Sequence, residues 1–234
     1  MRVLGILAAM PQELAAVLAD FDAERAEPVA GRVFHRGEAG AVPLVAVVAG
    51  IGKTSVAATT TLLIERFGVE RVLLTGVAGA VSDELALGDI VVATAALHHD
   101  LDASPIVPPH FVPSLGIDRL TCDEALSASA FDAARWFVRE DAPTARVHRG
   151  LVVSGDRFLG TQEIAELRGR LPDALAVEME GAAVAQVCLE SSVPFAIVRS
   201  ISDDGDAGSF DRFLEREAGR YAEGIVGRLL TGLE

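Results

Sequence analysis

Short apolar runs alternate with segments of helical spacing along most of this chain. Val3–Ala9 is continuously apolar, as expected for a β-strand that is covered on both faces. Pro11 suits the first turn of a helix, so a helix should follow that strand directly. Further strands are predicted at residues 71–75, 90–95, 147–153, 174–177 and 193–201. Further helices are predicted at residues 55–67, 123–140, 161–170, 180–190 and 210–230.

The order of these elements predicts an α/β protein. Two extended segments, residues 32–38 and 42–49, flank Gly40 and are typical of a hairpin or of neighbouring strands. Elsewhere strands and helices alternate, and no internal repeat, low-complexity segment or linker interrupts them. We therefore expect a single domain over residues 1–234, built on a mixed, mostly parallel sheet that helices cover on both faces.

Composition and charge exclude several classes of protein. Half of the residues are apolar, so the chain can bury a large core, and the net charge of −14 argues against a nucleic-acid partner. No apolar run is long enough for a membrane span, and the apolar start is too short for a signal peptide. Cys122 and Cys188 fit no metal or redox spacing. We expect both cysteines to be reduced, in a cytoplasmic protein.

The stretch 174–206 carries the candidate chemistry. Glu178, Glu180, Arg199 and Asp203 are predicted to lie at strand ends, where open α/β sheets bind ligands. Glu180 should also begin a helix, and Asp203 should be half-buried, which raises the pKa of a carboxyl group. Carboxylates in contrasting environments suit acid/base catalysis, although helix caps and a turn would explain the same residues. Glu13 is likewise either a helix-dipole partner or a ligand group.

Three other motifs are ambiguous or fail. Gly50–Thr54 suggests a phosphate loop, but Val47 stands where that motif needs its first glycine, which leaves only a turn where backbone can approach a ligand. His98–Asp102 suggests a metal site, but neighbouring side chains of an extended chain point to opposite faces. The proline-rich segment 104–116 is too apolar for a free loop. We expect it to lie against a pocket or a second subunit.

Blocks of residues spread in order over nearly the whole chain resemble one family. They are Ala8–Glu13, Gly50–Lys53, Thr75–Gly79, Gly88–Val92, His99-Asp100, Val153–Phe158, Val177–Glu180 and Val198–Asp203. These blocks are similar to those of the 5'-methylthioadenosine/S-adenosylhomocysteine nucleosidases. The pair Val-Glu-Met-Glu and Arg-x-Ile-Ser-Asp is fairly specific to the nucleoside phosphorylase/nucleosidase superfamily, and the glutamate of the first block indicates its hydrolase branch.

The resemblance implies a three-layer αβα sandwich around a mixed, mostly parallel twisted sheet. It also implies a homodimer with a shared active site, no metal and no organic cofactor. The reaction it implies is hydrolysis of the N-glycosidic bond of 5'-thio-adenosines to adenine and a thioribose, with 5'-deoxyadenosine as a further substrate. The protein would bind small purine nucleosides and would bind neither nucleic acid nor membranes.

The resemblance also implies residue roles. Asp203 would be the general acid at purine N7, Glu13 would hold and activate water, and Glu180 would accept hydrogen bonds from the ribose hydroxyls. The purine would lie near Gly79, Phe158 and Leu159, and the ribose near Met179 and Arg199. The remaining substrate contacts would come from Met10, Ile51, Ala78 and Phe210, most of them in the 5'-thio pocket.

Two departures from the family pattern leave other functions open. Val77 stands where the resemblance leads us to expect serine, and the prolines of segment 103–115 differ from the loop of well-known members. The second departure favours a larger 5'-substituted purine nucleoside, such as futalosine, as an alternative substrate. A phosphorylase is a further alternative, but it would carry arginine where Thr75 stands. A purine-binding module without catalysis would bind adenine without turnover.

Overall fold

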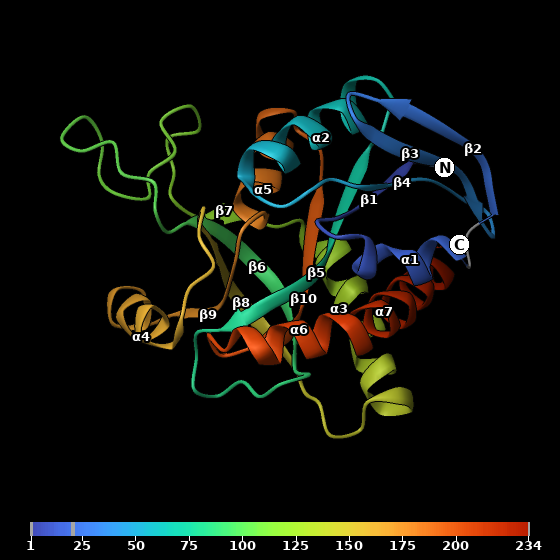
Figure 1. The fold of residues 1–234 in the computed structure, drawn as a ribbon. Coiled ribbons are helices and arrows are strands. Elements are labelled where there is room, and N and C mark those ends of the chain that lie inside the picture. Colours follow the sequence, from blue (N-terminus) through green and yellow to red (C-terminus); the bar gives the residue numbers. More distant parts are fainter. Residues whose placement is uncertain (1, 20–21, 234) are drawn as a thin grey trace.

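The computed structural model describes residues 2–19 and 22–233 (Figure 1). Its strands are β1 (Leu4–Ala8), β2 (Asp22–Val29), β3 (Arg32–Ala39), β4 (Val42–Val48), β5 (Arg71–Ala80), β6 (Ile90–His98), β7 (Leu120–Thr121), β8 (Val147–Ser154), β9 (Ala174–Glu178) and β10 (Phe195–Asp203). Its helices are α1 (Pro11–Ala19), α2 (Lys53–Glu65), α3 (Glu124–Asp141), α4 (Thr161–Arg170), α5 (Gly181–Glu190), α6 (Ala207–Arg216) and α7 (Ala218–Leu233). The predicted alternation of strands and helices is confirmed.

A single mixed sheet contains all of these strands. Its order is β10-β6-β8-β9-β5-β1-β4-β3-β2, and β7 pairs with β6. Strand β5 also pairs with β10 in parallel, so β10, β6, β8, β9 and β5 form a closed ring. Because β5 pairs with β9 in the antiparallel direction, the end of β5 lies between β9 and β10. This ring brings together residues that are far apart in the sequence.

Helices cover both faces of the sheet, as the sequence predicts (Figure 1). On one face, α1, α3, α6 and α7 bury apolar side chains against β1, β4 and β6. On the other face, α2 and α5 pack against each other and share a second core with the sheet. Helix α4 closes a smaller apolar cluster beside β8 and β9. The αβα architecture is therefore confirmed.

Four local predictions differ from the structure. Strand β5 does not stop at Thr75, because its glycines keep an extended backbone that pairs with β9 and β10. The predicted closing helix is two helices, since the backbone leaves the helical conformation at Glu217. Strands β2 and β7 were not predicted: β2 forms a hairpin with β3 but is rich in charged residues and contains Pro28, and the two residues of β7 depend on pairing with β6. The N-cap of helix α4 is Gly160, one residue before the predicted helix, and Glu163 accepts from its N–H at 3.0 Å.

The proline-rich segment between β6 and β7 projects from the body of the chain (Figure 1). Ile106 in this segment exposes 86% of its surface, and no residue of the segment lines the cavity described below. Cys122 and Cys188 are both free and buried, as expected for reduced core residues. Within the described residues, no helix is long and apolar enough to cross a membrane.

Candidate active site

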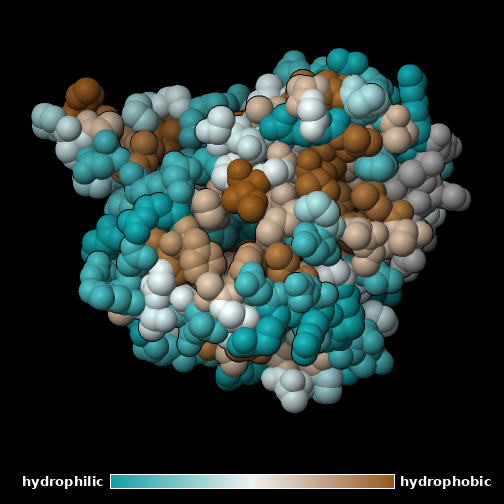
Figure 2. All heavy atoms as spheres, in the orientation of Figure 1, coloured by the Kyte–Doolittle hydropathy of each residue, from teal (hydrophilic) through white to brown (hydrophobic). Residues whose placement is uncertain are grey.

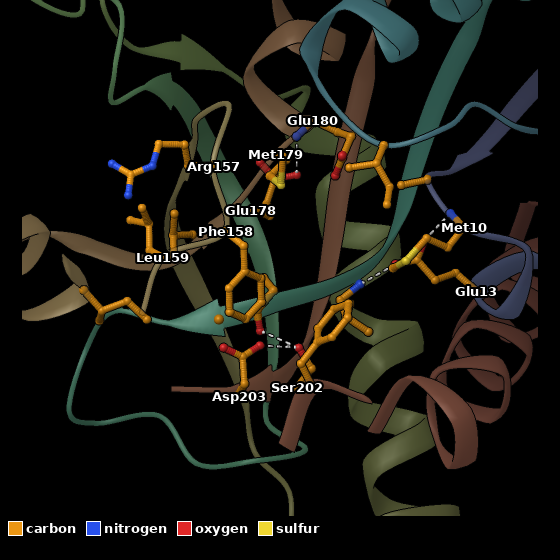
Figure 3. A pocket seen from close by; sticks show the side chains of 18 residues that line it. Met10, Glu13, Arg157, Phe158, Leu159, Glu178, Met179, Glu180, Ser202 and Asp203 are labelled. Atoms are coloured by element: carbon orange, nitrogen blue, oxygen red, sulfur yellow. Dashed lines mark hydrogen bonds between the residues drawn. The ribbon is translucent and has the colours of Figure 1, made fainter. Parts of the chain in front are cut away.

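One cavity of about 220 Å³ opens where β5, β9 and β10 end. Figure 2 shows apolar surface around the hollow at the centre of this face. Figure 3 shows Glu13, Glu180 and Asp203 around the same space. The three predicted acidic residues therefore open into one cavity. The other predicted residues that line this cavity are Met10, Ile51, Ala78, Gly79, Phe158, Leu159, Met179 and Phe210.

Glu13 is held by the fold at the start of α1. Its Oε2 accepts from the backbone N–H of Met10 at 2.8 Å, the reverse contact by which a glutamate in the first turn caps its own helix. Its Oε1 accepts from the N–H of Val77 on β5 at 2.9 Å. Only 1% of the residue is exposed, and burial raises the pKa of Glu13 although nearby Arg199 and these N–H groups oppose the rise. Glu13 therefore caps α1 and also lines the cavity, so its place at the helix terminus is confirmed and its role as a ligand group stays a prediction.

Glu180 is the N-cap of α5, as predicted, but its side chain does not cap the helix. Its Oε1 accepts from the backbone N–H of Gly52 at 2.7 Å, and its Oε2 lies 3.4 Å from Nη2 of Arg199. The pKa of Glu180 is raised to about 7, first by burial and second by the nearby charge of Glu178. A carboxyl group with this pKa changes its charge near neutral pH.

Arg199 lies in the middle of β10, not at its end as the sequence predicts. The guanidinium is fully buried and contacts the carboxylate of Glu178, which ends β9. Glu178 also accepts from the N–H groups of Glu180 and Gly181 and contacts the hydroxyl of Ser154. Arg199 does not line the cavity, and it lies directly behind the residues that do. Its positive charge therefore lies next to the carboxyl groups of Glu178 and Glu180.

Asp203 is the last residue of β10, and only 3% of it is exposed. Its Oδ1 accepts from the N–H of Gly205 at 2.8 Å, and its Oδ2 lies 2.8 Å from the hydroxyl of Ser202. Burial raises the pKa of Asp203, and the charges of Asp204 and Asp206 raise it further. The carboxyl group therefore keeps its proton to a higher pH than an exposed aspartate.

Two glycines of β5 let these groups approach the strand. A Cβ at Gly76 would lie 2.4 Å from Nη1 of Arg199 and 2.5 Å from Oε1 of Glu13, which real Cβ atoms do not tolerate. A Cβ at Gly79 would lie 3.1 Å from Oδ1 of Asp203. Close approach therefore requires glycine at Gly76, whereas a side chain at Gly79 would make Asp203 shift by a few tenths of an ångström.

The cavity walls are apolar at two places. The rings of Phe158 and Phe210 meet edge to face, with centroids 5.5 Å apart. Phe158 exposes 46% of its surface and Ile51 exposes 56%, so both lie at the mouth. An exposed aromatic ring such as that of Phe158 is suited to stacking on a purine. An exposed aliphatic chain such as that of Ile51 is suited to covering a hydrophobic substituent.

Several residues that line the cavity were given no role from the sequence, namely Ala9, Arg157, Ile164, Val177 and Ser202. Glu178, a predicted strand-end carboxylate, and Val77 line it as well. A signal was available for Ser202, which directly precedes Asp203 at the strand end. Ile164 gave no such signal, since it is one apolar residue among many in α4. His98–Asp102 forms no metal site, and no group of three or more His, Cys, Asp or Glu residues that could hold a metal occurs in the described part of the chain.

Comparisons with known proteins agree with this geometry. The sequence profile of the phosphorylase superfamily matches residues 3–231. The 5'-methylthioadenosine/S-adenosylhomocysteine nucleosidase of Staphylococcus saprophyticus is 36% identical, over 97% of this chain and 99% of that protein. The aminodeoxyfutalosine nucleosidase of Helicobacter pylori strain J99 is 39% identical, over 93% of this chain and 94% of that protein.

A solved structure is similar over the whole length. The 5'-methylthioadenosine/S-adenosylhomocysteine nucleosidase of Neisseria meningitidis, in complex with methylthio-immucillin-A, superposes with a TM-score of 0.91 at 32% identity. The similarity covers 99% of this chain and all of that one. This protein therefore belongs to the phosphorylase superfamily, in the family of the 5'-methylthioadenosine/S-adenosylhomocysteine nucleosidases.

Proposed function

We propose that this protein hydrolyses the N-glycosidic bond of 5'-methylthioadenosine and S-adenosylhomocysteine, releasing adenine and the 5'-substituted ribose. The observation that carries the proposal is the meeting of three buried carboxyl groups, Glu13, Glu180 and Asp203, in one apolar-walled cavity. It is supported by the nucleosidase relatives, which match nearly the full chain.

Asp203 is the proposed general acid. Adenine is a poor leaving group until its N7 is protonated, so the acid must keep its proton near neutral pH. Burial and the neighbouring acidic residues raise the pKa of Asp203 in the required direction. The proton passes from the carboxyl group to N7 as the bond between N9 and C1' breaks, and adenine leaves as a neutral base. Gly79 leaves space beside this carboxyl group for the purine.

Glu13 and Glu180 are the proposed groups on the sugar side. As the glycosidic bond lengthens, the ribose acquires positive charge, as in other glycoside cleavages. An ionised Glu180 would accept hydrogen bonds from the ribose hydroxyls and stabilise that charge, with Met179 and the Arg199 cation beside it. Glu13 would hold water and remove its proton while the oxygen bonds to C1'. The raised pKa of Glu13 makes it a stronger base than an exposed glutamate.

The remaining predicted contacts fit the two ends of the substrate. Phe158 and Leu159 line the cavity and are the proposed contacts of the purine, and Ala78 lines it as a further proposed contact of the substrate. Met10, Ile51 and Phe210 supply the apolar lining that a thioether substituent needs. Four acidic side chains line this cavity, which disfavours a phosphate dianion as nucleophile. Hydrolysis is therefore favoured over phosphorolysis.

The test is adenine release from 5'-methylthioadenosine in phosphate-free buffer. Turnover without phosphate is expected, whereas strict phosphate dependence would refute the hydrolase. Asp203→Asn should lower kcat by about 10²–10⁴-fold, the usual contribution of a general acid, and leave nucleoside binding largely intact. Asp211→Asn removes an exposed carboxylate on α6 and is the matched control. Near-native activity of Asp203→Asn would remove the acid assignment.

A second candidate substrate is aminodeoxyfutalosine or futalosine. The Helicobacter pylori aminodeoxyfutalosine nucleosidase is 39% identical over 223 residues, against 36% over 241 residues for the Staphylococcus enzyme, and the proline-rich segment differs from the family pattern. The ratio of kcat/KM for 5'-methylthioadenosine and aminodeoxyfutalosine decides between them. A preference for the larger substrate would replace the first candidate without changing the chemistry.

We also propose a cytoplasmic homodimer in which the segment between β6 and β7 of one subunit completes the pocket of the other. The exposed Ile106 and Ile117 on that segment support this, because apolar side chains on a projecting loop are typical of an interface. Light scattering on the purified protein should give twice the mass of the chain, and a monomer that is fully active would refute the shared site.

A further inference from the structure

We propose that Lys53 is a positioning residue for the active site, although its side chain does not line the cavity; this inference rests on the proposed function. Lys53 is the only lysine in the sequence, and every other residue among the 20 lysines and arginines is an arginine. A chain that otherwise uses arginine alone has an ammonium group at this one position, which calls for a structural reason.

Lys53 joins two carboxylates from different segments. Its Nζ lies 2.6 Å from Oδ1 of Asp100 and 3.1 Å from Oδ2 of Asp156. Oδ2 of Asp100 also accepts from the backbone N–H of Asp156 at 2.7 Å, which closes the cluster. We call these three residues the Lys53 cluster. It links the first residue of α2 to the segments that follow β6 and β8.

One consequence concerns Glu180. The backbone N–H of Gly52, next to Lys53, donates to Oε1 of Glu180 at 2.7 Å. Gly52 has a φ of 96°, and no other atom lies within 4 Å of the place where its Cβ would be. The turn is held from one side by Arg32, which donates to the carbonyl groups of Ala49 and Ser55. Lys53 holds it from the other side, because its ion pairs tie the residue next to Gly52 to the segments that follow β6 and β8.

The other consequence concerns Phe158. Asp156 lies two residues before Phe158, in the exposed segment between β8 and α4. The Lys53 cluster fixes both the backbone and the side chain of Asp156. It thereby sets the position of the ring that is proposed to stack on adenine. One cation thus connects the purine side of the cavity to the carboxylate proposed for the ribose.

An ordinary surface ion pair would have little effect, since such pairs contribute about 0–1 kcal/mol. Lys53 differs because its side chain is only 18% exposed and has two acceptors on two segments. A compact ammonium directs its three N–H groups apart and can bridge such acceptors in a small space. A planar guanidinium is larger and suits a single bidentate partner. This difference explains why arginine does not stand here.

The experiment compares Lys53→Met with the native protein in the adenine-release assay across pH. We expect kcat/KM to fall about tenfold or more, the usual effect of losing a hydrogen bond to a charged group. The N–H of Gly52 lowers the pKa of Glu180, so losing it should raise that pKa and move the acidic limb of the kcat profile to higher pH. The KM should rise as well, because the segment carrying Phe158 is released.

Two further variants and one control sharpen this test. Asp156→Asn leaves the pair of Lys53 and Asp100 in place, so it should raise KM with a smaller change in the pH profile. Lys53→Arg keeps the cation and should fall between the native protein and Lys53→Met. Arg119→Met removes a cation from an ion pair remote from the cavity, with 2.8 Å between Arg119 and Asp173, and should change neither quantity.

A Lys53→Met protein that melts earlier but keeps the native pH profile and KM would overturn the inference, because a merely structural role has that result. A folded Asp156→Asn protein with the native KM would also contradict the inference. A Lys53→Arg protein with no higher kcat/KM than Lys53→Met would contradict it as well. An inactive native protein would instead count against the proposed function. An active native protein with unchanged variants would count against Lys53 alone.

Discussion

Replacing Glu178 with glutamine tests the buried ion pair beneath the cavity. Arg199 is fully buried, and the side chain of Glu178 is only 3% exposed. Glu178→Gln keeps the size of the side chain but leaves the guanidinium without its main counter-charge. The amide also cannot replace both carboxylate oxygens, which accept from the N–H of Gly181 at 2.9 and 2.8 Å.

The expected loss of stability is large. Breaking a buried ion pair by removing one partner costs about 3–5 kcal/mol, because the other charge remains buried. In a chain of this length each kcal/mol lowers the Tm by roughly 2–4 °C, so we expect a decrease of roughly 6–20 °C. Glu124→Gln is the matched control, since Glu124 is 79% exposed in its pair with Arg149 and such pairs contribute about 0–1 kcal/mol.

The same variant should move the pH profile. The negative charge of Glu178 is, after burial, the largest cause of the raised pKa of Glu180. Removing that charge should lower the pKa of Glu180, so the acidic limb of kcat should move to lower pH, opposite to the shift expected for Lys53→Met. Thermal melting and adenine release measure the two effects. A Tm loss no larger than that of Glu124→Gln, or a limb that moves upward, would refute this account of the pair.

Three further outcomes are expected. Gly76→Ala should abolish activity, because its Cβ would displace both Glu13 and Arg199; retained turnover with a native Tm would contradict the close approach. Phe158→Ala should raise the KM about tenfold or more through the loss of base stacking, worth about 1–3 kcal/mol, with a smaller effect on kcat. Ionising Glu180 in the folded protein is unfavourable, so its contribution to the free energy of unfolding should be full below pH 4.5 and should be lost as the pH rises towards 7. In denaturation curves at several pH values, Glu180→Gln should weaken that fall.

The sequence sufficed for the residues at strand ends. Glu180 and Asp203 each follow an apolar run, and such residues meet at one edge of an α/β sheet whatever the details of pairing. Glu13 could be placed for the same reason, since Pro11 indicates the helix that follows β1. These predictions need only local pattern and one rule of topology, and the cavity contains all three residues.

The sequence did not suffice for partners that meet through distant pairing. Arg199 was expected at a strand end, but it lies in the middle of β10, where a buried cation is unfavourable without a counter-charge. Its counter-charge comes from β9, which reaches it only because the five-stranded ring closes. Lys53 likewise appeared in a failed phosphate-loop motif. Its partners Asp100 and Asp156 follow two other strands, and no local pattern connects them.

The closed ring also explains how two acids can work on one bond. Glu13 and Asp203 approach β5 at Gly76 and Gly79, three residues apart along an extended strand. At about 3.3 Å per residue these positions are roughly 10 Å apart, so the carboxyl groups stand on separate sides of the cavity. A sugar ring and a water molecule fit between groups so spaced, whereas direct attack by a carboxylate needs them about 5 Å apart. The spacing on β5 therefore supports the proposed attack by water at Glu13 over a covalent bond between Glu13 and the sugar.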